Sequence, residues 1–165
     1  MRKLIWLASV MLLTGCATTG KPQPRTPAKA PAGLIKILED DRVTSYIDFR
    51  VISTYQGNSR LRRFYFINNY AERTLIIKEP PVYVSSSRAI DVINCDTNQR
   101  AVMGRTLFSE PFAEGDLIHA ELEIGQWETY SKESLLGIVA ESMCLIPVEK
   151  LKPEPPKETR KPLLD

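Results

Sequence analysis

The stretch that decides the fold reads VTSYIDFRV at residues 43–51, QGNS at residues 56–59 and LRRFYFI at residues 61–67. In the first run, apolar and polar residues alternate with a period of two, which predicts a strand with one buried face. The third run is rich in aromatic residues and suits a second strand. The Gly-Asn pair between the two runs favours a tight turn. Together they predict an antiparallel hairpin.

Three further runs have the character of strands, at residues 88–95, 100–108 and 116–124. Turn-forming residues separate them, namely Asp96, Thr97 and Asn98 in the first gap and Gly115 in the second. In the last run, Ile118, Ala120, Leu122 and Ile124 alternate with polar residues, which predicts that half of this strand faces water. The pattern of residues 70–78 is ambiguous, and two prolines end that segment.

The period changes after Trp127 to the intervals of three and four that mark one helix face, at Leu135, Ile138, Val139, Ser142, Met143 and Ile146. Ser131 or Ser134 is a candidate N-cap, and Pro147 ends the helix. Strands followed by one helix predict the α+β class. We expect a single antiparallel β-sheet of about five to six strands, with a C-terminal α-helix packed on it, in a domain of residues 34–149.

The segments on both sides of this domain are rich in proline. Residues 16–33 are interpreted as a semi-extended linker, and residues 150–165, called the tail below, as a disordered segment. Both are basic, whereas the domain has 12 basic and 17 acidic residues. Anionic lipid head groups would attract such basic segments. Lysines that only keep a linker soluble explain the pattern equally well.

The first sixteen residues indicate the compartment. Two basic residues precede a run of ten apolar residues at 4–13, which is half of the roughly twenty residues that a membrane-spanning helix needs. This pattern is typical of a signal peptide, here residues 1–15. Leu13-Thr14-Gly15-Cys16 resembles the lipobox of bacterial lipoproteins, which implies a lipid on Cys16. An ordinary cysteine beside a cleavage site is the alternative. Ala17 after the cysteine implies the outer membrane of a Gram-negative bacterium, on either face.

The two remaining cysteines, Cys95 and Cys144, would lie in an oxidising compartment and are expected to form a disulfide. One follows a predicted strand and the other ends the predicted helix, so the bond would hold the helix on the sheet. A metal site and a redox pair are the rival interpretations. The chain has no CxxC motif and a single histidine, His119, so neither rival has the usual ligands or spacing.

Catalytic patterns are absent from the sequence. His119 falls on the polar side of a predicted strand, and no glycine-rich phosphate loop or nucleophile motif occurs. Glu121 and Glu123 share a face and are interpreted as solvated surface. The near balance of 22 basic and 20 acidic residues does not favour a nucleic-acid binder. We therefore expect neither an enzyme nor a cofactor or metal.

Binding to another protein is the remaining class of function. Arg60, Arg62, Arg63 and Tyr65 form a basic and aromatic cluster beside the predicted turn. Arginine and tyrosine are enriched at binding hot spots, so these four residues are candidates for contact with a protein. The alternative is that the aromatic residues enter the core while the arginines cover its rim. The sequence leaves a homodimer open.

Several short motifs make the domain similar to the surface-adhesin protein E family: Tyr46-Ile47-Asp48, Ser85-Ser86-Ser87, Asn94-Cys95-Asp96, Arg100, residues 112–116 with Gly115, Trp127, and a helix from Ser134 to Cys144. The resemblance implies an antiparallel sheet of about six strands and a C-terminal helix tied on by a disulfide. Characterised members are outer-membrane lipoproteins that bind host matrix proteins such as vitronectin and laminin. This chain departs from the pattern at Phe64, where the family often has tryptophan, and in its basic tail.

Two hypotheses of function follow from these residues. The first is a lipid-anchored, non-catalytic binding module that acts as an adhesin for host extracellular-matrix proteins. The second is an outer-membrane lipoprotein that faces the periplasm and docks on another envelope protein, with the tail as a contact segment.

Overall fold

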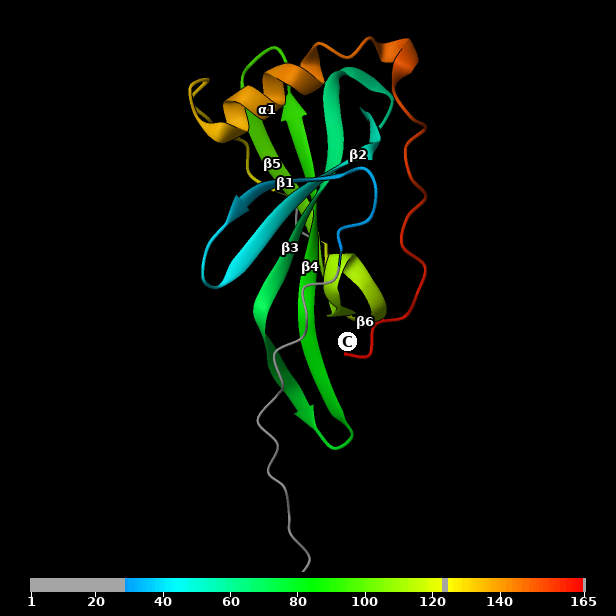
Figure 1. Ribbon diagram of the computed structural model, residues 1–165. Coiled ribbons are helices and arrows are strands. Elements are labelled where there is room, and N and C mark those ends of the chain that lie inside the picture. The colour runs from blue at the N-terminus through cyan, green and yellow to red at the C-terminus, as the bar shows by residue number, and fades with distance from the viewer. Residues whose placement is uncertain (1–28, 123–124, 165) are drawn as a thin grey trace, which may run out of the picture.

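The computed structural model describes residues 29–122 and 125–164, which form one antiparallel sheet and one α-helix (Figure 1). The strands lie in chain order, and the short β7 pairs with β5. Their bounds are β1 Leu34–Glu39, β2 Val43–Tyr55, β3 Asn58–Lys78, β4 Pro81–Asn94, β5 Gln99–Glu110, β6 Glu114–Glu121 and β7 Glu128–Thr129. Helix α1 spans Leu135–Cys144, and 3-10 turns cover Pro111–Ala113 and Val148–Lys150. The predicted fold class is confirmed.

The β2–β3 hairpin confirms the prediction from residues 43–67. Tyr55 faces Asn58 across the turn, so Gln56 and Gly57 are its two central residues, with φ of 51° and 73°. Positive φ at both positions matches the type I′ turn, whose twist suits two antiparallel strands. Glycine reaches this conformation without steric cost.

Strands β3 and β4 are longer than the sequence indicated, and their far ends form an arm that projects beyond the rest of the sheet (Figure 1). The ambiguous residues 70–78 are the last part of β3. In β4 the three consecutive serines Ser85, Ser86 and Ser87 are buried. The Ser85 and Ser86 hydroxyls donate to the carbonyls of Ser109 and Glu110. These two hydrogen bonds join β4 to the end of β5.

The two sheet edges differ most from expectation. Strand β1 was not predicted, because its residues show no clear alternation, yet it pairs with β2 along its whole length. In β6 the expected alternation fails: Leu117 and Ile118 are both buried, whereas Ala120 and Leu122 are exposed. A register shift opposite Leu107 and Phe108 explains this, since an extra residue in one strand turns the following side chains to the other face.

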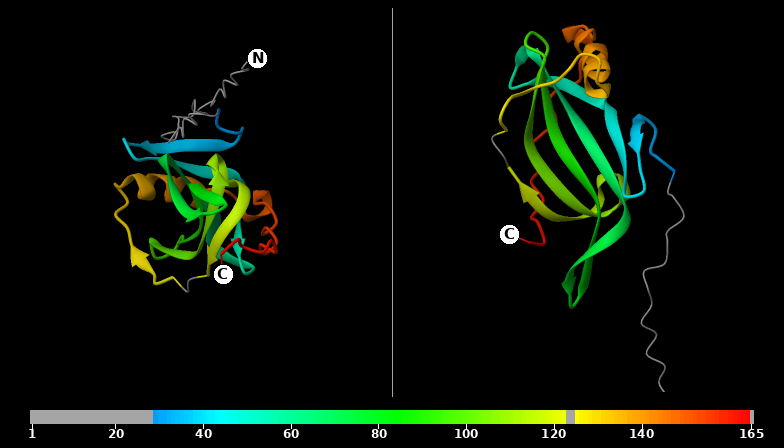
Figure 2. Two further views of the ribbon diagram at one scale, coloured as in Figure 1. Left: turned by 90° about the horizontal axis from the view of Figure 1, so that it is seen from below. Right: turned by 90° about the vertical axis from the view of Figure 1, so that its left-hand side faces the viewer.

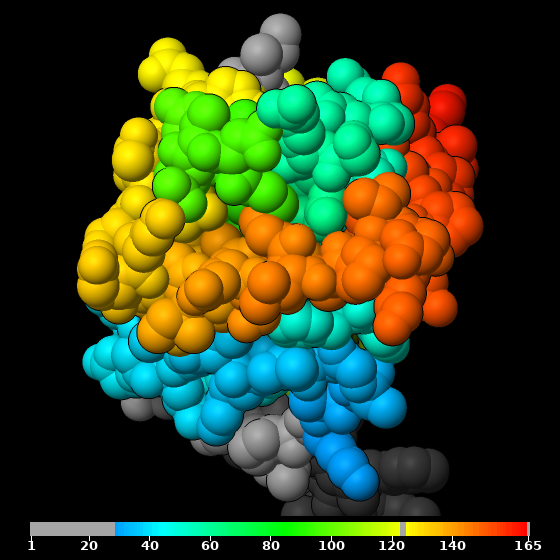
Figure 3. Space-filling model, turned by 90° about the horizontal axis from the view of Figure 1, so that it is seen from above, coloured from blue at the N-terminus to red at the C-terminus, as the bar shows by residue number. Residues whose placement is uncertain are grey.

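Helix α1 lies across the top of the molecule, between the β2–β3 and β4–β5 turns on one side and strands β1 and β2 on the other (Figure 3). Ser134 is its N-cap, and its hydroxyl accepts from the amide of Gly137 at 3.1 Å. The predicted apolar face was partly wrong. Ile138 is 57% exposed, and the buried positions of α1 are Gly137, Ala140 and Met143. Two of these residues are small, which lets the helix approach the sheet closely.

The core lies between α1 and one face of the sheet. Its buried residues are Ile47, Ile52, Phe64, Ile93, Ala140 and Met143. The register pairs Tyr65 with Ile90, and Phe64 with Asp91, so neighbouring residues of β3 serve opposite faces. On the face away from the helix, Tyr46 packs edge-on against Phe112, with 5.4 Å between ring centroids.

The tail differs from the disordered segment that the sequence predicted. It leaves the end of α1 and runs beside the sheet to β6 (Figures 1 and 2). The amide of Lys152 donates to the carbonyl of Ile52 at 2.9 Å, and the amides of Leu163 and Leu164 donate to Leu117 and Ile118 at 2.9 and 2.8 Å. Backbone hydrogen bonds at both ends thus join the tail to β2 and to β6, a pairing that proline content alone does not reveal.

Candidate binding surface

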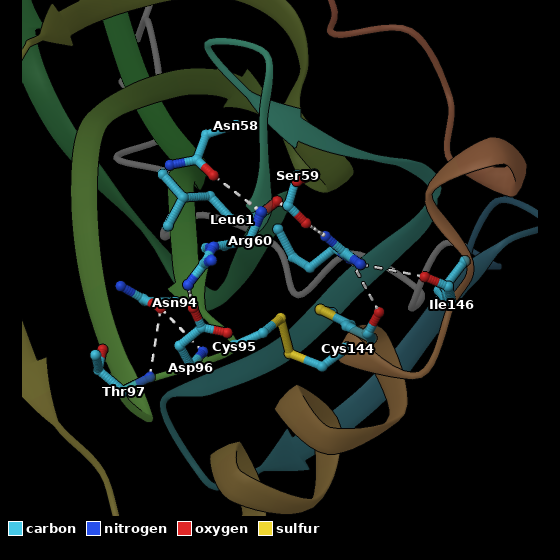
Figure 4. The surroundings of a disulfide bond; sticks show 12 residues. Asn58, Ser59, Arg60, Leu61, Asn94, Cys95, Asp96, Thr97, Cys144 and Ile146 are labelled. Carbon is cyan, nitrogen blue, oxygen red and sulfur yellow. Dashed lines mark hydrogen bonds and ion pairs between the residues drawn. A yellow bond between two sulfur atoms is a disulfide. The ribbon is translucent and has the colours of Figure 1, made fainter.

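The disulfide between Cys95 and Cys144 joins the end of β4 to the last residue of α1 (Figure 4). Their Cα atoms are 5.7 Å apart. The amide of Cys95 also donates to the carbonyl of Arg60 in the neighbouring strand at 3.0 Å. The predicted bond therefore exists and has the predicted role, because it fixes the C-terminal end of the helix to the sheet.

Arg62 supports the same junction and is buried, with 4% of its surface exposed. Its guanidinium donates to the carbonyls of Met143 at 3.3 Å and Ile146 at 3.2 Å, and Figure 4 shows Ile146 beside the disulfide. A cation at the carbonyl end of a helix is favourable. Burial lowers the pKa of Arg62. This residue holds the helix end and is not available to a partner.

The four predicted binding residues do not form one exposed surface. Arg60 is the most accessible, with 73% of its side chain exposed beside Asp96, with which it forms an ion pair. Arg63 is buried, with 4% exposed. Its guanidinium carbon lies 4.6 Å from the centre of the Tyr65 ring, and it donates to the Tyr65 hydroxyl at 3.0 Å. Arg60 is thus separated in role from Arg63 and Tyr65.

Tyr65 belongs to a larger stack that the sequence did not reveal. The guanidinium carbon of Arg88 lies 4.6 Å from the Tyr65 ring centre and 5.1 Å from that of Phe108. Arg63 and Tyr65 of β3, Arg88 of β4 and Phe108 of β5 therefore alternate as cation and ring, and we call these four residues the arginine ladder. A cation over an aromatic ring is attracted electrostatically to the face of the ring. No sequence period links these strands, so only their register shows the stack.

The tail contributes the carboxylate at this place. Glu158 lies 3.2 Å from the guanidinium of Arg88 and accepts two bonds of 3.0 Å from Arg160. These hydrogen bonds, with Arg160 the largest cause, lower the pKa of Glu158 to about 2. The guanidinium of Arg160 also lies 5.6 Å from the centre of the Phe108 ring. Glu158 and Arg160 thus extend the ladder from outside the sheet.

A second buried charge lies on the helix side of the sheet. The carboxylate of Asp91 is fully buried and forms an ion pair with Arg100, while its second oxygen has no hydrogen-bond partner. Burial raises the pKa of Asp91, although the hydrogen bond from Arg100 opposes this. The positive charge of Arg105 also opposes this rise in the pKa of Asp91.

Exposed apolar side chains include two groups that could serve as contact surfaces. Leu75 and Ile76 are exposed on the projecting arm. On α1 and just after it, Leu135, Ile138 and Leu145 are exposed. Exposed apolar residues that gather on one element mark a surface for protein contact more often than for chemistry.

Groups for catalysis do not gather in the described part of the chain. His119 is half-buried, and its Nδ1 lies 3.5 Å from the carbonyl oxygen of Leu164 in the tail. Residues 29–122 and 125–164 contain no cluster of three possible metal ligands. Within the same ranges, no helix has the length and apolar character needed to span a bilayer.

The sequence model of the surface-adhesin protein E family matches residues 34–145, from β1 to the residue after α1. The chain belongs to the surface-adhesin protein E family. Its fold is similar to solved structures of protein E from Haemophilus influenzae. One, from a non-typeable strain, has a TM-score of 0.61 and 19% identity, over 76% of this chain and 82% of that one. Another has a TM-score of 0.62 and 16% identity, over 78% and 96%.

The match ends before the tail, so the tail contacts of this surface-adhesin protein E family member lie outside the matched domain. Both cysteines of the disulfide lie inside it. The family is one of adhesins, which supports a role in binding and a non-catalytic function. Cys16 and most of the linker, residues 16–28, lie outside the described residues.

Proposed function

We propose that this protein is a lipid-anchored adhesin of the bacterial outer membrane, a non-catalytic module that binds host extracellular-matrix proteins. The match of the adhesin family to the complete sheet and helix is the observation that carries this proposal. The projecting arm with exposed Leu75 and Ile76 supports it, because an arm that extends past the body offers apolar contact area to a large partner.

The anchor is proposed from the lipobox at Cys16 and the linker that follows it. Two or more acyl chains attach a protein stably, whereas one chain does so only marginally. Metabolic labelling with palmitate should mark the wild-type protein and leave Cys16→Ser unlabelled. Label on the variant would contradict attachment at this residue.

Surface display and binding need separate tests. Protease added to intact cells should remove the domain. If only permeabilised cells lose it, the protein does not face outward and cannot act as an adhesin. Purified protein should bind immobilised vitronectin or laminin, and the double variant Leu75→Asp/Ile76→Asp should bind more weakly. Glu149→Gln, at an exposed residue away from the arm, serves as the control.

The periplasm-facing alternative is favoured by a different surface. Leu135, Ile138 and Leu145 are exposed at α1, and an envelope protein could cover them. Site-specific cross-linkers at residue 138 should then capture an envelope protein in cells. In this structure the tail lies on its own domain, so α1 replaces the tail as the expected contact. Absence of any cross-linked species from cells would count against this second function.

A further inference from the structure

The arginine ladder carries more positive charge than its own domain neutralises. Among the described residues, the carboxylate that forms an ion pair with Arg88 is Glu158 of the tail, and Arg63 has no carboxylate within 4.0 Å. Arg63 Nη1 and Arg88 Nε are buried and have no hydrogen-bond partner. Buried donors without partners are unfavourable. The ladder therefore keeps unused capacity for a negatively charged group.

The tail residue that forms an ion pair with Arg88 is acidic, although the tail is mostly basic. Residues 151–164 have four basic and two acidic residues, yet it is the acidic Glu158 that contacts Arg88. The domain is acidic overall, so general attraction explains why a basic tail stays near it. It does not explain the contact of an acid with the ladder. Two hydrogen bonds from Arg160 hold the carboxylate of Glu158 in place, and Arg88 forms an ion pair with it.

The tail also shows how a peptide fits this place. Its backbone pairs with β2 at Lys152 and with β6 at Leu163 and Leu164, and Glu158 lies between these contacts. An extended chain with one carboxylate near its middle thus contacts Arg88 and pairs with both flanking strands. Main-chain pairing combined with a side-chain pocket is a general way to recognise extended peptides.

We propose that the arginine ladder is a binding site for a glutamate or aspartate side chain on an extended segment of a partner protein, and that the tail occupies this site in the free protein. A partner must displace the tail, so its apparent affinity equals its intrinsic affinity multiplied by the fraction of molecules in which the tail is released. The tail acts as a built-in competitor that rejects weak acidic ligands.

The test uses the full chain and a labelled peptide with the sequence of residues 151–164. The Glu158→Gln protein, whose own tail is weakened at the ladder, should bind this peptide roughly tenfold more tightly than wild type does. A Glu-to-Gln version of the peptide should lose that gain. The double variant Glu158→Gln/Arg88→Gln should lose the tighter binding of the wild-type peptide. The control Glu149→Gln, at an exposed acid before the tail, should behave as wild type.

An unrelated proline-rich peptide with a single glutamate extends the test to other partners. The Glu158→Gln protein should bind this peptide more tightly than it binds the same peptide with glutamine in place of the glutamate. Equal binding of the acidic and neutral peptides would overturn the proposal, because backbone pairing alone would then explain the contact. Absence of peptide binding to Glu158→Gln would also overturn it. Amide hydrogen exchange at Leu163 and Leu164 shows in each variant whether the tail is released.

The biological role of this site rests on the proposed binding function, but the two can fail separately. Peptide binding in solution does not depend on anchoring or surface display. Loss of matrix binding with intact peptide binding would reject the adhesin function and keep the site, and the reverse result would reject the site alone.

Discussion

The buried carboxylate of Asp91 forms an ion pair with the partly exposed Arg100, and loss of Arg100 leaves an uncompensated charge in the core. Arg100→Met should therefore destabilise the fold by about 3–5 kcal/mol at pH 7. The pKa of Asp91 is already raised by burial, and loss of Arg100 raises it further. A carboxyl whose folded-state pKa exceeds its unfolded value favours folding at low pH and loses that contribution as pH rises through the folded pKa. The loss of unfolding free energy in Arg100→Met relative to wild type, measured by urea unfolding, should hence be smaller at pH 5 than at pH 7.

The control for this prediction replaces both partners with apolar residues. Asp91→Leu/Arg100→Met should recover most of the lost stability, because neither charge then remains buried. An equal deficit of Arg100→Met at both pH values would show that lost packing, and not the unpaired carboxylate, causes the effect.

Gly137 is the second residue with an unusual requirement. A Cβ at this position would lie 2.4 Å from the carbonyl oxygens of Ser131 and Lys132, which are backbone atoms and cannot rotate away. Glycine to alanine usually stabilises a helix by up to about 1 kcal/mol. Here Gly137→Ala should instead destabilise by about 1–3 kcal/mol through overpacking. Thermal unfolding would measure this, with the exposed Ser142→Ala as a control that stays within about 0.5 kcal/mol.

The junction of α1 with the sheet is the main feature at the scale of elements. The disulfide closes a loop with a sequence separation of 49 residues, and the chain-entropy estimate for such a loop is about 4 kcal/mol. Cys95→Ser/Cys144→Ser should lower the free energy of unfolding by about this amount, a large share of the roughly 5–15 kcal/mol typical of domains. Reductant should destabilise the wild type and leave the double variant unchanged. A similar response of both proteins would contradict the role of the bond.

Sequence patterns predicted the elements that have a clear period and missed those that depend on neighbours. The hairpin at residues 43–67, the later strands and the cap at Ser134 follow local chemistry and were confirmed. Strand β1 forms because β2 offers an edge, and β6 changes faces at a register shift. The helix face was mistaken because Gly137 and Ala140 are buried for their small size, which hydrophobicity does not report.

The candidate site shows the same division. Cys95 and Cys144 were predicted from their number and compartment, whereas Arg62 and Arg63 were predicted as contacts because arginine is enriched at binding hot spots. Arg62 is buried because helix carbonyls accept its hydrogen bonds, and Arg63 because Tyr65 stacks on it. The carbonyls that bind Arg62 lie 81 and 84 residues away along the chain and leave no local signal, whereas Tyr65 is only two residues from Arg63.

At the scale of the whole molecule, the tail joins β2 and β6, which do not pair with each other. The pKa of Glu158 is held at about 2. The ionised carboxylate therefore contributes its full stabilisation above the ordinary pKa of about 4.5, and this stabilisation is lost only as pH falls toward 2. Arg160, the largest cause of the shift, is itself in the tail, so only the share from Arg88 depends on docking. Protection factors at Leu163 and Leu164 should therefore stay constant from pH 7 to pH 5.

Glu158→Gln should lower these protection factors at every pH in that range, because the neutral amide lacks the charge-assisted bond to Arg88. Lys161→Gln, a change of charge next to the same contact, is the matched control and should have little effect. A sharp loss of protection in wild type near pH 5 would show that another group controls the docking.

The exposed edge of strand β1 affects how neighbouring molecules associate. It is the outer strand of the sheet, and Ile35 and Leu38 are exposed on it. An unpaired strand edge with apolar side chains invites sheets of neighbouring molecules to join and aggregate. Three features oppose this: the strand has six residues, its register shifts between Lys36 and Leu38, and Lys36 pairs with Glu39 on it. Neighbouring copies can then stand side by side without polymerising through their sheets.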